Sequence, residues 1–254
     1  DFVDILAVLR GNTFRGWDPE RTRFRLYTIV LAAQALHAAG YAMGISLDQQ
    51  AGRKPPGEEA VIVYIGDGAM SEGDASEALT FVLFFVQNNQ YAISTPASTQ
   101  TAVSYATRAK GFGIPGHRID GNDVLASYAV TKHVMDAVRA GGGPALIEAV
   151  TYRLGPHTSS DDPTKYRTVQ ERSSWERRDP IPRLRAHLSE RGVTDDVFES
   201  IDAHNAEHAG DVRRRLIALP APDPGGMFDH VYSDAHPVAH AQKAWLRDYL
   251  DSFE

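Results

Sequence analysis

Runs of apolar residues alternate with amphipathic stretches along this chain, and this alternation predicts a fold class. Mostly apolar runs of strand length occupy residues 61–65, 82–86 and 145–150. Apolar residues recur with helical spacing at residues 69–79 and 124–139. Because strands that alternate with helices build parallel sheets, the pattern predicts an α/β fold with helices flanking a parallel sheet.

The regions before and after these strands are predicted to be mostly helical. Residues 27–47 begin extended and continue as a helix rich in alanine and glycine, whose small side chains permit close packing against another element. Residues 180–191 and 195–219 are amphipathic with helical spacing. We therefore expect an α/β domain over residues 1–179, and a helical C-terminal extension with a tail over residues 180–254.

Composition excludes some classes of partner. A hydrophobic content of 43% with 23% charged residues suits a globular domain with a sizeable core. A net charge of −7 gives no electrostatic reason to bind nucleic acid. No apolar run approaches the roughly 20 residues of a membrane helix, and no charged-then-apolar leader is found, so we expect neither a membrane protein nor a secreted one.

Chemistry-bearing residues follow two of the predicted strands. The run at residues 61–65 ends in Gly66, Asp67 and Gly68, and the next run leads to Asn89. Glycines on both sides of the carboxylate allow a tight turn and let backbone N–H groups approach an anion. Since neighbouring parallel strands end at one edge of a sheet, the carboxylate and the amide should meet there.

This pair of strand ends predicts a magnesium diphosphate site. Mg²⁺ prefers about six oxygen ligands at roughly 2.1 Å, and three could come from the Asp67 carboxylate, the Asn89 amide and the Tyr91 backbone carbonyl. Two diphosphate oxygens and a water would complete the shell. A helix over residues 69–79, beginning at Ala69, would point its N-terminus at the diphosphate. One Gly-Asp-Gly is usually only a turn, but the two strand ends together are far more specific.

The arrangement resembles the thiamin-diphosphate motif of the 2-oxo acid dehydrogenases. The resemblance is closest to the alpha subunit of their decarboxylating first component, as in the branched-chain and pyruvate complexes. It covers most of the chain, and residues 152–167 form its most specific block. The matching segments are residues 66–74, 84–94, 113–116, 118–123 and 152–167. The resemblance implies a thiamin-diphosphate-binding fold that holds thiamin diphosphate and Mg²⁺.

The resemblance also implies roles for individual residues. His157 matches a family histidine near the diphosphate and the reactive carbon, where it could bind phosphate or stabilise charge as the substrate adds. Ile29 and Leu31 align with positions that meet the aminopyrimidine, although composition alone makes them core residues, and both interpretations stay open. The implied cofactor-binding residues are Ile29, Leu31, Gly66, Asp67, Gly68, Ala69, Asn89 and His157, the metal ligands are Asp67, Asn89 and Tyr91, and the catalytic residue is His157.

The loop at residues 153–167 has two interpretations. It is either a solvated charged loop or a lid held by arginine–carboxylate pairs, which are directional and often bidentate. The residues concerned are Arg153, Asp161, Asp162, Tyr166 and Arg167. We expect a lid of this kind to become ordered when cofactor binds.

The implied activity needs partners. It is the oxidative decarboxylation of a branched-chain 2-oxo acid or pyruvate, with transfer of the acyl group to the lipoyl domain of the acyltransferase component. The glutamate that activates the cofactor belongs to a beta subunit in the family, so the resemblance implies an α2β2 heterotetramer with a site shared between subunits. It implies a cytoplasmic location, or the mitochondrial matrix in a eukaryote.

Two other functions remain open. One is the alpha subunit of acetoin dehydrogenase or of another split thiamin enzyme; the block at residues 152–167 disfavours a split transketolase. The other is a non-catalytic module that binds magnesium diphosphate or a nucleotide. Residues 71–74 and 91–94 look like branched-chain members, whereas residues 155–158 and 161–164 also occur in bacterial pyruvate members. We lean towards branched-chain 2-oxo acids.

The chain departs from the family pattern in two places. Fewer residues separate Gly68 from Asn89 than in family members. The predicted helix after Gly68 and the predicted strand before Asn89 use all of them, whereas a loop between a helix and a strand needs about 2–6 residues. We therefore expect residues to be missing between Phe81 and Val82. Family members also carry a long segment before the position of Asp1, with a Tyr-Arg pair that reaches the diphosphate and has no counterpart here.

Overall fold

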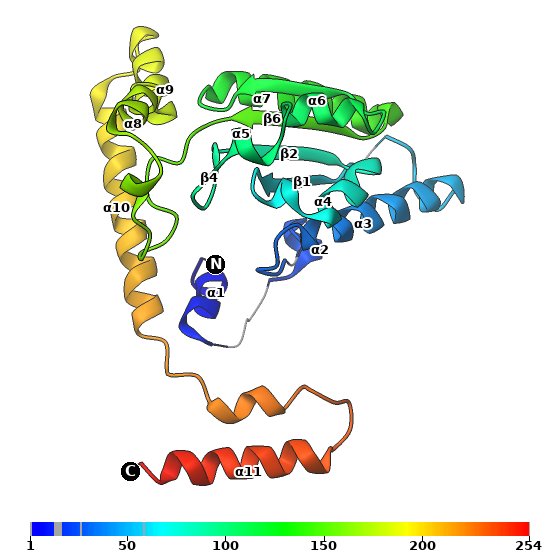
Figure 1. The fold of residues 1–254 in the computed structure, drawn as a ribbon, viewed down its shortest axis with the longest axis vertical. Helices are drawn as coiled ribbons and strands as arrows, with labels where there is room; N and C mark the ends of the chain where they lie inside the picture. The colour runs from blue at the N-terminus through cyan, green and yellow to red at the C-terminus, as the bar shows by residue number, and fades with distance from the viewer. Residues whose placement is uncertain (1, 13–16, 26, 58, 254) are drawn as a thin grey trace. The chain divides into compact units, whose positions relative to one another are not determined.

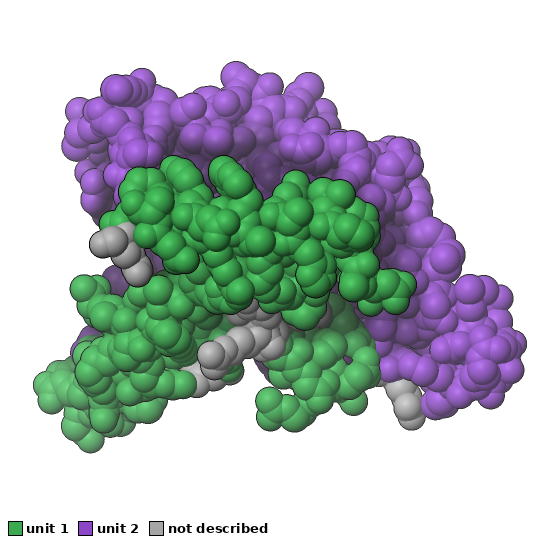
Figure 2. Space-filling view, turned by 90° about the horizontal axis from the view of Figure 1, so that it is seen from below, with its two compact units in different colours: residues 1–26, 195–254 green, residues 27–194 purple. Residues whose placement is uncertain are grey.

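In the computed structural model the chain divides by contacts into two compact units (Figure 2). One unit joins residues 1–26 to residues 195–254, and the other comprises Tyr27–Thr194. The predicted domain boundary at residue 179 remains a prediction. The residues that the structure describes are 2–12, 17–25, 27–57 and 59–253.

A four-stranded parallel sheet forms the centre of the second unit (Figure 1). Its strands are β1 (Ile62–Gly66), β2 (Leu83–Asn88), β5 (Gly116–Asp120) and β6 (Ala145–Val150), in the order β1-β2-β6-β5. Every neighbouring pair is parallel. The prediction of an α/β fold with a parallel sheet is confirmed, and β1 and β2 are neighbours, as the strand-end argument requires.

Helices cover both faces of this sheet. On one face, alanines of α3 (Ala33–Gln50), α4 (Gly73–Glu77) and α6 (Tyr105–Lys110) pack against alternate strand residues such as Phe84 and Leu146. On the other face, Leu83, Ala145 and Ile147 pack against α7 (Val124–Ala137). Small side chains on the first face let the helices approach closely, so the sequence's alanine-rich stretch becomes core.

The predicted helix over residues 69–79 is broken. It consists of a 3-10 turn η2 (Ala69–Ser71), the five-residue α4, and a second 3-10 turn η3 (Ala78–Thr80). Glu72 between them has an extended backbone (φ −74°, ψ 145°). Gly73 lowers the helix propensity at that point, and α4 is too short to present a helix N-terminus to an anion. The prediction of one continuous helix is wrong.

The expectation of missing residues between Phe81 and Val82 stays a prediction, although the chain as it stands makes this connection without strain on the strand pairing. The chain runs continuously from η3 through a turn at these two residues into β2. Leu83 already donates its backbone N–H to Val61 O at 3.1 Å. The helix ends early and tightens into a 3-10 turn, which frees two residues for the connection, within the usual range of about 2–6.

Beyond β2 the chain forms a small antiparallel pair, β3 (Tyr91–Ala92) and β4 (Thr95–Pro96), and then α5 (Ala97–Gln100). Gln90 (φ 77°) and Ile93 (φ 53°) adopt left-handed backbone conformations at the two bends. Such conformations cost free energy in residues other than glycine and persist where neighbouring bonds enforce them. This short hairpin therefore needs hydrogen bonds from outside itself.

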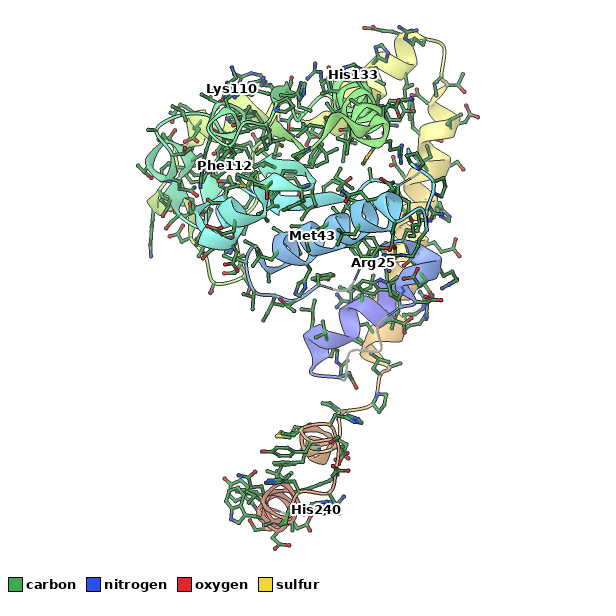
Figure 3. The ribbon with its side chains drawn as sticks, turned by 90° about the vertical axis from the view of Figure 1, so that its right-hand side faces the viewer. Arg25, Met43, Lys110, Phe112, His133 and His240 are labelled. Carbon is green, nitrogen blue, oxygen red and sulfur yellow. The ribbon has the colours of Figure 1, made fainter. Side chains whose placement is uncertain are left out.

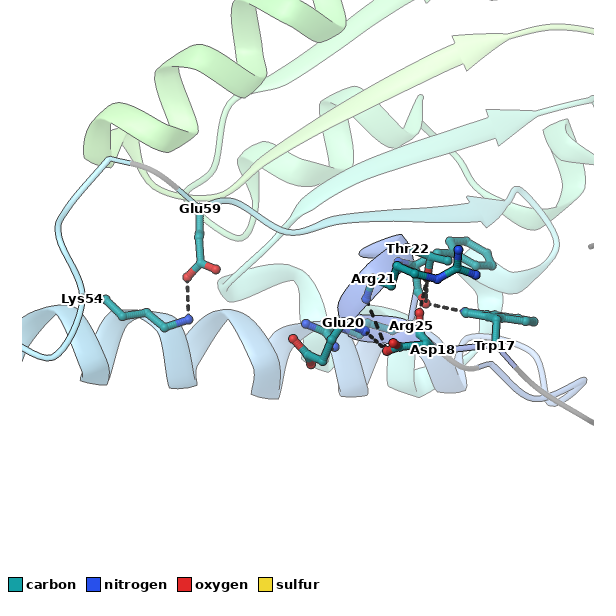
Figure 4. Close-up of polar contacts among 9 residues, drawn as sticks. Trp17, Asp18, Glu20, Arg21, Thr22, Arg25, Lys54 and Glu59 are labelled. Atoms are coloured by element: carbon teal, nitrogen blue, oxygen red, sulfur yellow. Dashed lines mark hydrogen bonds and ion pairs between the residues drawn. The ribbon is translucent and has the colours of Figure 1, made fainter.

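The rest of the second unit follows β6. The loop after β6 contains η5 (Pro163–Lys165) and leads to α8 (Val169–Glu176) and α9 (Pro180–Glu190), while η4 (Val138–Gly142) ends α7. Ahead of β1, an ion pair between Lys54 and Glu59 at 2.8 Å spans the loop (Figure 4).

The first unit is helical. It contains α1 (Phe2–Leu6), η1 (Ala7–Arg10), α2 (Pro19–Thr22), α10 (Asp195–Ile217), η6 (Pro224–Phe228) and α11 (Pro237–Asp251). Arg10 donates to Leu216 O and Ile217 O, at 3.0 Å each, and so satisfies carbonyls at the end of α10.

Local hydrogen bonds define the start of α2 in this unit. Asp18 caps the helix by accepting from Glu20 N at 2.9 Å (Figure 4).

The C-terminal region differs from its expectation in one respect, since the segment read only as a tail contains the amphipathic helix α11. Among the described residues, none of the helices combines the length and the apolar character that a membrane crossing requires.

Candidate functional site at the carboxyl edge of the sheet

Asp67 follows the last residue of β1 and is 1% exposed. Its two carboxylate oxygens accept hydrogen bonds from Asn89 N and from the Gln100 amide, both at 3.3 Å. Burial raises the pKa of Asp67, and these hydrogen bonds partly offset the rise. The carboxylate is thus desolvated and held only by long N–H donors, an arrangement that favours a cation placed against it.

Asn89 lies directly after β2, beside Asp67. Its side-chain oxygen accepts from Tyr91 N at 3.1 Å, and its backbone N–H points at Asp67. Because β1 and β2 are adjacent and parallel, the two residues do lie together, but the contact to the carboxylate comes from the backbone N–H of Asn89 and not from its side-chain amide. Tyr91 O, the third predicted ligand, accepts from Arg153 at 3.0 Å and keeps its second lone pair.

The glycine turn is packed against the hairpin that carries Tyr91. A Cβ on Gly68 would lie 2.8 Å from the Cβ of Ala92, closer than such atoms approach one another. Gly68 is therefore required for the close approach, whereas its φ of −60° suits any residue. From the other side, the buried Tyr105 hydroxyl donates to Asp67 O at 3.1 Å, and burial raises the pKa of Tyr105 to about 12.

The donor set suits Mg²⁺. Asp67, Asn89 and Tyr91 offer only oxygen, the ligand atom that hard cations prefer. Among the described residues, no group of three or more histidine, cysteine, aspartate or glutamate side chains could hold a metal. A metal at this edge would therefore rest on one carboxylate and take further oxygens from its ligand, as a diphosphate complex does.

The loop that leaves β6 is bound to the same place. Beyond the sheet, Thr151 N donates to Asn88 O at 2.9 Å and Arg153 N to Asn89 O at 3.2 Å. The Arg153 guanidinium donates to Tyr91 O, to Ile93 O and to the Tyr166 hydroxyl. One arginine thus fastens the loop to the strained hairpin.

The predicted arginine–carboxylate pairs are wrong in detail. Arg167 is buried and donates to three backbone carbonyls of the loop, those of Arg153, Leu154 and Gly155. Such carbonyls have no strand partner outside the sheet, so the arginine satisfies them. Asp161 instead accepts from the Tyr166 hydroxyl at 2.6 Å and from His157 N at 2.8 Å. These hydrogen bonds lower the pKa of Asp161.

The remaining predicted residues are more exposed. His157 lies on the surface of the loop, with its backbone fixed by Asp161. Ile29 is 91% exposed and Leu31 59%, just before α3, so their interpretation as core residues is wrong. Their proposed contact with an aminopyrimidine, and the catalytic role of His157, stay predictions. Ala69 is buried in the turn next to Gly68.

Several residues at this edge escaped sequence reasoning. Gln100 contacts Asp67 from α5, a segment without a clear periodic pattern. Glu171, on α8, accepts from the Tyr91 hydroxyl at 2.8 Å, and burial together with this carboxylate raises the pKa of Tyr91 to about 12. Of these residues, only Glu148 could have been identified from the sequence, since it is the only charged residue in the apolar run at residues 145–150.

Replacing Arg153 with lysine should loosen the loop. A lysine cannot reach three acceptors at once from a planar fork, so Tyr91 O and Ile93 O lose donors. We expect amide hydrogen exchange across residues 153–167 to rise by roughly tenfold, equivalent to about 1.4 kcal/mol of opening free energy. Arg172→Lys, which alters an exposed pair with Glu176, is the control. Unchanged exchange in the Arg153 variant would contradict the anchoring role.

The chain is similar to known dehydrogenase subunits. The model of the dehydrogenase E1 component family matches residues 9–213. The chain is 44% identical to the 3-methyl-2-oxobutanoate dehydrogenase subunit alpha of Mycobacterium tuberculosis, over 88% of this chain and 61% of the relative. It is 43% identical to the pyruvate dehydrogenase E1 component subunit alpha of Staphylococcus aureus, over 75% of this chain and 51% of the relative. The chain thus spans about half to three fifths of these relatives.

Proposed function

Because the chain belongs to the dehydrogenase E1 component family, we propose that it serves as the alpha subunit of a thiamin-diphosphate-dependent 2-oxo acid dehydrogenase. The observation that carries the proposal is the juxtaposition of Asp67 and Asn89 at two neighbouring strand ends, with Asn89 N on the Asp67 carboxylate. The oxygen donors at this edge suit a magnesium diphosphate and not a softer metal.

Members of this family generally depend on thiamin diphosphate, which supplies a carbanion and electron sink for the cleavage of 2-oxo acids. In our proposal Asp67, Asn89 and Tyr91 O hold the metal that binds the diphosphate. Gly68 gives the turn room against Ala92. Arg153 fastens the loop that carries His157, so that this histidine can bind phosphate or stabilise negative charge near the substrate.

The exposed apolar residues support a shared site. Ile29 and Leu31 precede α3, and the exposed side of that helix carries further apolar side chains, Leu36, Met43 and Leu47. Met43 is labelled in Figure 3. Apolar surface of this kind is typical of a contact with another subunit. We propose that a beta subunit covers it in an α2β2 assembly and supplies the activating glutamate, and that a lipoyl domain receives the acyl group.

We propose a branched-chain 2-oxo acid as substrate, because residues 71–74 and 91–94 look like branched-chain members. A pocket shaped for the larger side chain gains roughly 10- to 200-fold from an additional methylene. The assembled α/β protein should therefore show a kcat/KM for 3-methyl-2-oxobutanoate at least about tenfold above that for pyruvate. Steady-state rates on both acids measure this ratio, and a preference for pyruvate would reverse the assignment.

A further inference from the structure

A buried carboxylate that is not one of the proposed metal ligands lies within the sheet. Glu148, in the middle of β6, is 1% exposed and faces the side of the sheet covered by α6, as do Phe84 and Val86 on β2. Burying a charge is costly unless hydrogen bonds compensate it. The surroundings of Glu148 therefore indicate why the chain keeps a carboxylate here.

Glu148 receives hydrogen bonds from two elements. One carboxylate oxygen accepts from the Asn88 amide nitrogen at 2.8 Å, and the other accepts from Ala106 N at 3.0 Å. Arg118 lies farther away, at 3.7 Å, and is 58% exposed, so its ion pair is weak. The strongest contacts of Glu148 thus join β2 and the start of α6.

The Asn88 side chain connects Glu148 to the turn that follows β2. A carboxylate with N–H donors on both oxygens acts only as an acceptor, so it fixes the orientation of the Asn88 amide. The Asn88 side-chain oxygen must then face the turn, where it accepts from Gln90 N at 3.2 Å and from the Gln90 side chain at 3.1 Å. These bonds hold Gln90 in its left-handed conformation, at φ 77°.

Asn89 lies between these two bonded residues. Its position, with N–H on Asp67 and side-chain oxygen at Tyr91 N, depends on the turn that Asn88 and Gln90 enforce. We propose that Glu148 is a positioning residue of the metal–diphosphate site, which acts through the Asn88 amide to hold Asn89 against Asp67. The inference rests on the proposed function, because it assumes that Asp67 and Asn89 bind the metal.

Exchanging the two side-chain types tests this role. In Glu148→Gln, the side-chain oxygen accepts from Ala106 N and the NH₂ group faces Asn88. Asn88 must then rotate its amide so that its oxygen accepts from this NH₂ group. Its own NH₂ group then faces the N–H of Gln90, and two donors oppose each other. In Asn88→Asp, two carboxylates face each other. In the double variant, the carboxylate introduced at position 88 would accept both from the amide introduced at position 148 and from Gln90, so every donor regains an acceptor. The three variants therefore test whether the hydrogen-bond donors and acceptors at positions 88 and 148 match, and not whether either original residue is present.

The protein is first assembled with its beta subunit and is then titrated calorimetrically with thiamin diphosphate in the presence of Mg²⁺. Thermal unfolding is recorded in parallel. Loss of such a supporting partner typically weakens metal affinity roughly 10- to 100-fold. We expect each single variant to bind at least about tenfold more weakly, and the double variant to return to within about threefold of wild type. Asp136→Asn, an exposed carboxylate on α7, controls for the change of charge and should bind like wild type.

The outcomes separate this role from the proposed function. If wild type binds and Glu148→Gln lowers thermal stability without altering affinity, Glu148 is structural only and the inference is overturned. A folded double variant that still binds about tenfold more weakly overturns it too, even where a single variant fails to fold. If wild type itself binds no thiamin diphosphate, the proposed function falls first, and the positioning role with it.

Discussion

Replacing Asp67 with alanine is expected to weaken binding of magnesium thiamin diphosphate by roughly 30-fold to several thousand-fold. Removing one partner of a buried charge pair costs about 2–5 kcal/mol, and tenfold in affinity corresponds to about 1.4 kcal/mol. Asp67 carries the one carboxylate among the three proposed metal ligands and is almost fully buried. Calorimetric titration measures the change; Asp136→Asn is the control, because it removes a distant exposed carboxylate.

The same residue should make stability depend on pH. Burial raises the pKa of Asp67 above its ordinary value of 3.8 in the folded protein, so the folded state holds this proton more tightly than the unfolded chain. Without ligand, this group's contribution to stability therefore falls as pH rises from about 3.8 through the raised pKa. Asp67→Asn should then be at least as stable as wild type at about pH 7 in thermal unfolding, although it binds metal less well. A marked loss of stability would contradict the desolvation of this carboxylate.

The protein without a beta subunit is expected to decarboxylate 2-oxo acids at least about 10²- to 10⁴-fold more slowly than the assembled pair. A positioned general acid or base contributes about that factor, and in our proposal the activating glutamate comes from the partner. The exposed apolar residues around Ile29 and α3 would in addition leave the site open to water. Decarboxylation assays at increasing ratios of beta subunit measure the effect.

The titration should saturate at one beta subunit per chain, as an α2β2 assembly requires. Asp67→Ala mixed with the same beta subunit is the matched control, because it tests whether recovered activity passes through this chain's metal site. Substantial turnover by the protein alone would refute the shared site.

The parts of the site that lie next to strands could be predicted because their placement follows from local pattern. Apolar runs identify β1 and β2, and the rule that parallel strands end at one edge brings Asp67 and Asn89 together. The break of the predicted helix at Glu72 could not be foreseen from periodicity, since the apolar spacing over residues 69–79 does not reveal the extended backbone of this residue.

Contacts between distant segments were harder to predict. Gln100 reaches Asp67 across 33 positions and Arg153 reaches Tyr91 across 62, and the sequence carries no local signal for either. The exposure of Ile29 could not be inferred from its apolar character, because a residue that meets a partner and a residue of the core look alike in sequence.

The central claim is that the edge formed by Asp67 and Asn89 binds magnesium thiamin diphosphate. Calorimetric titration of the protein assembled with its beta subunit, once with thiamin diphosphate and once with ADP, both with Mg²⁺, tests it most directly. The account predicts saturable binding of thiamin diphosphate that Asp67→Ala weakens strongly, and much weaker binding of ADP. Binding of ADP without binding of thiamin diphosphate would contradict the account and indicate a nucleotide-binding module instead.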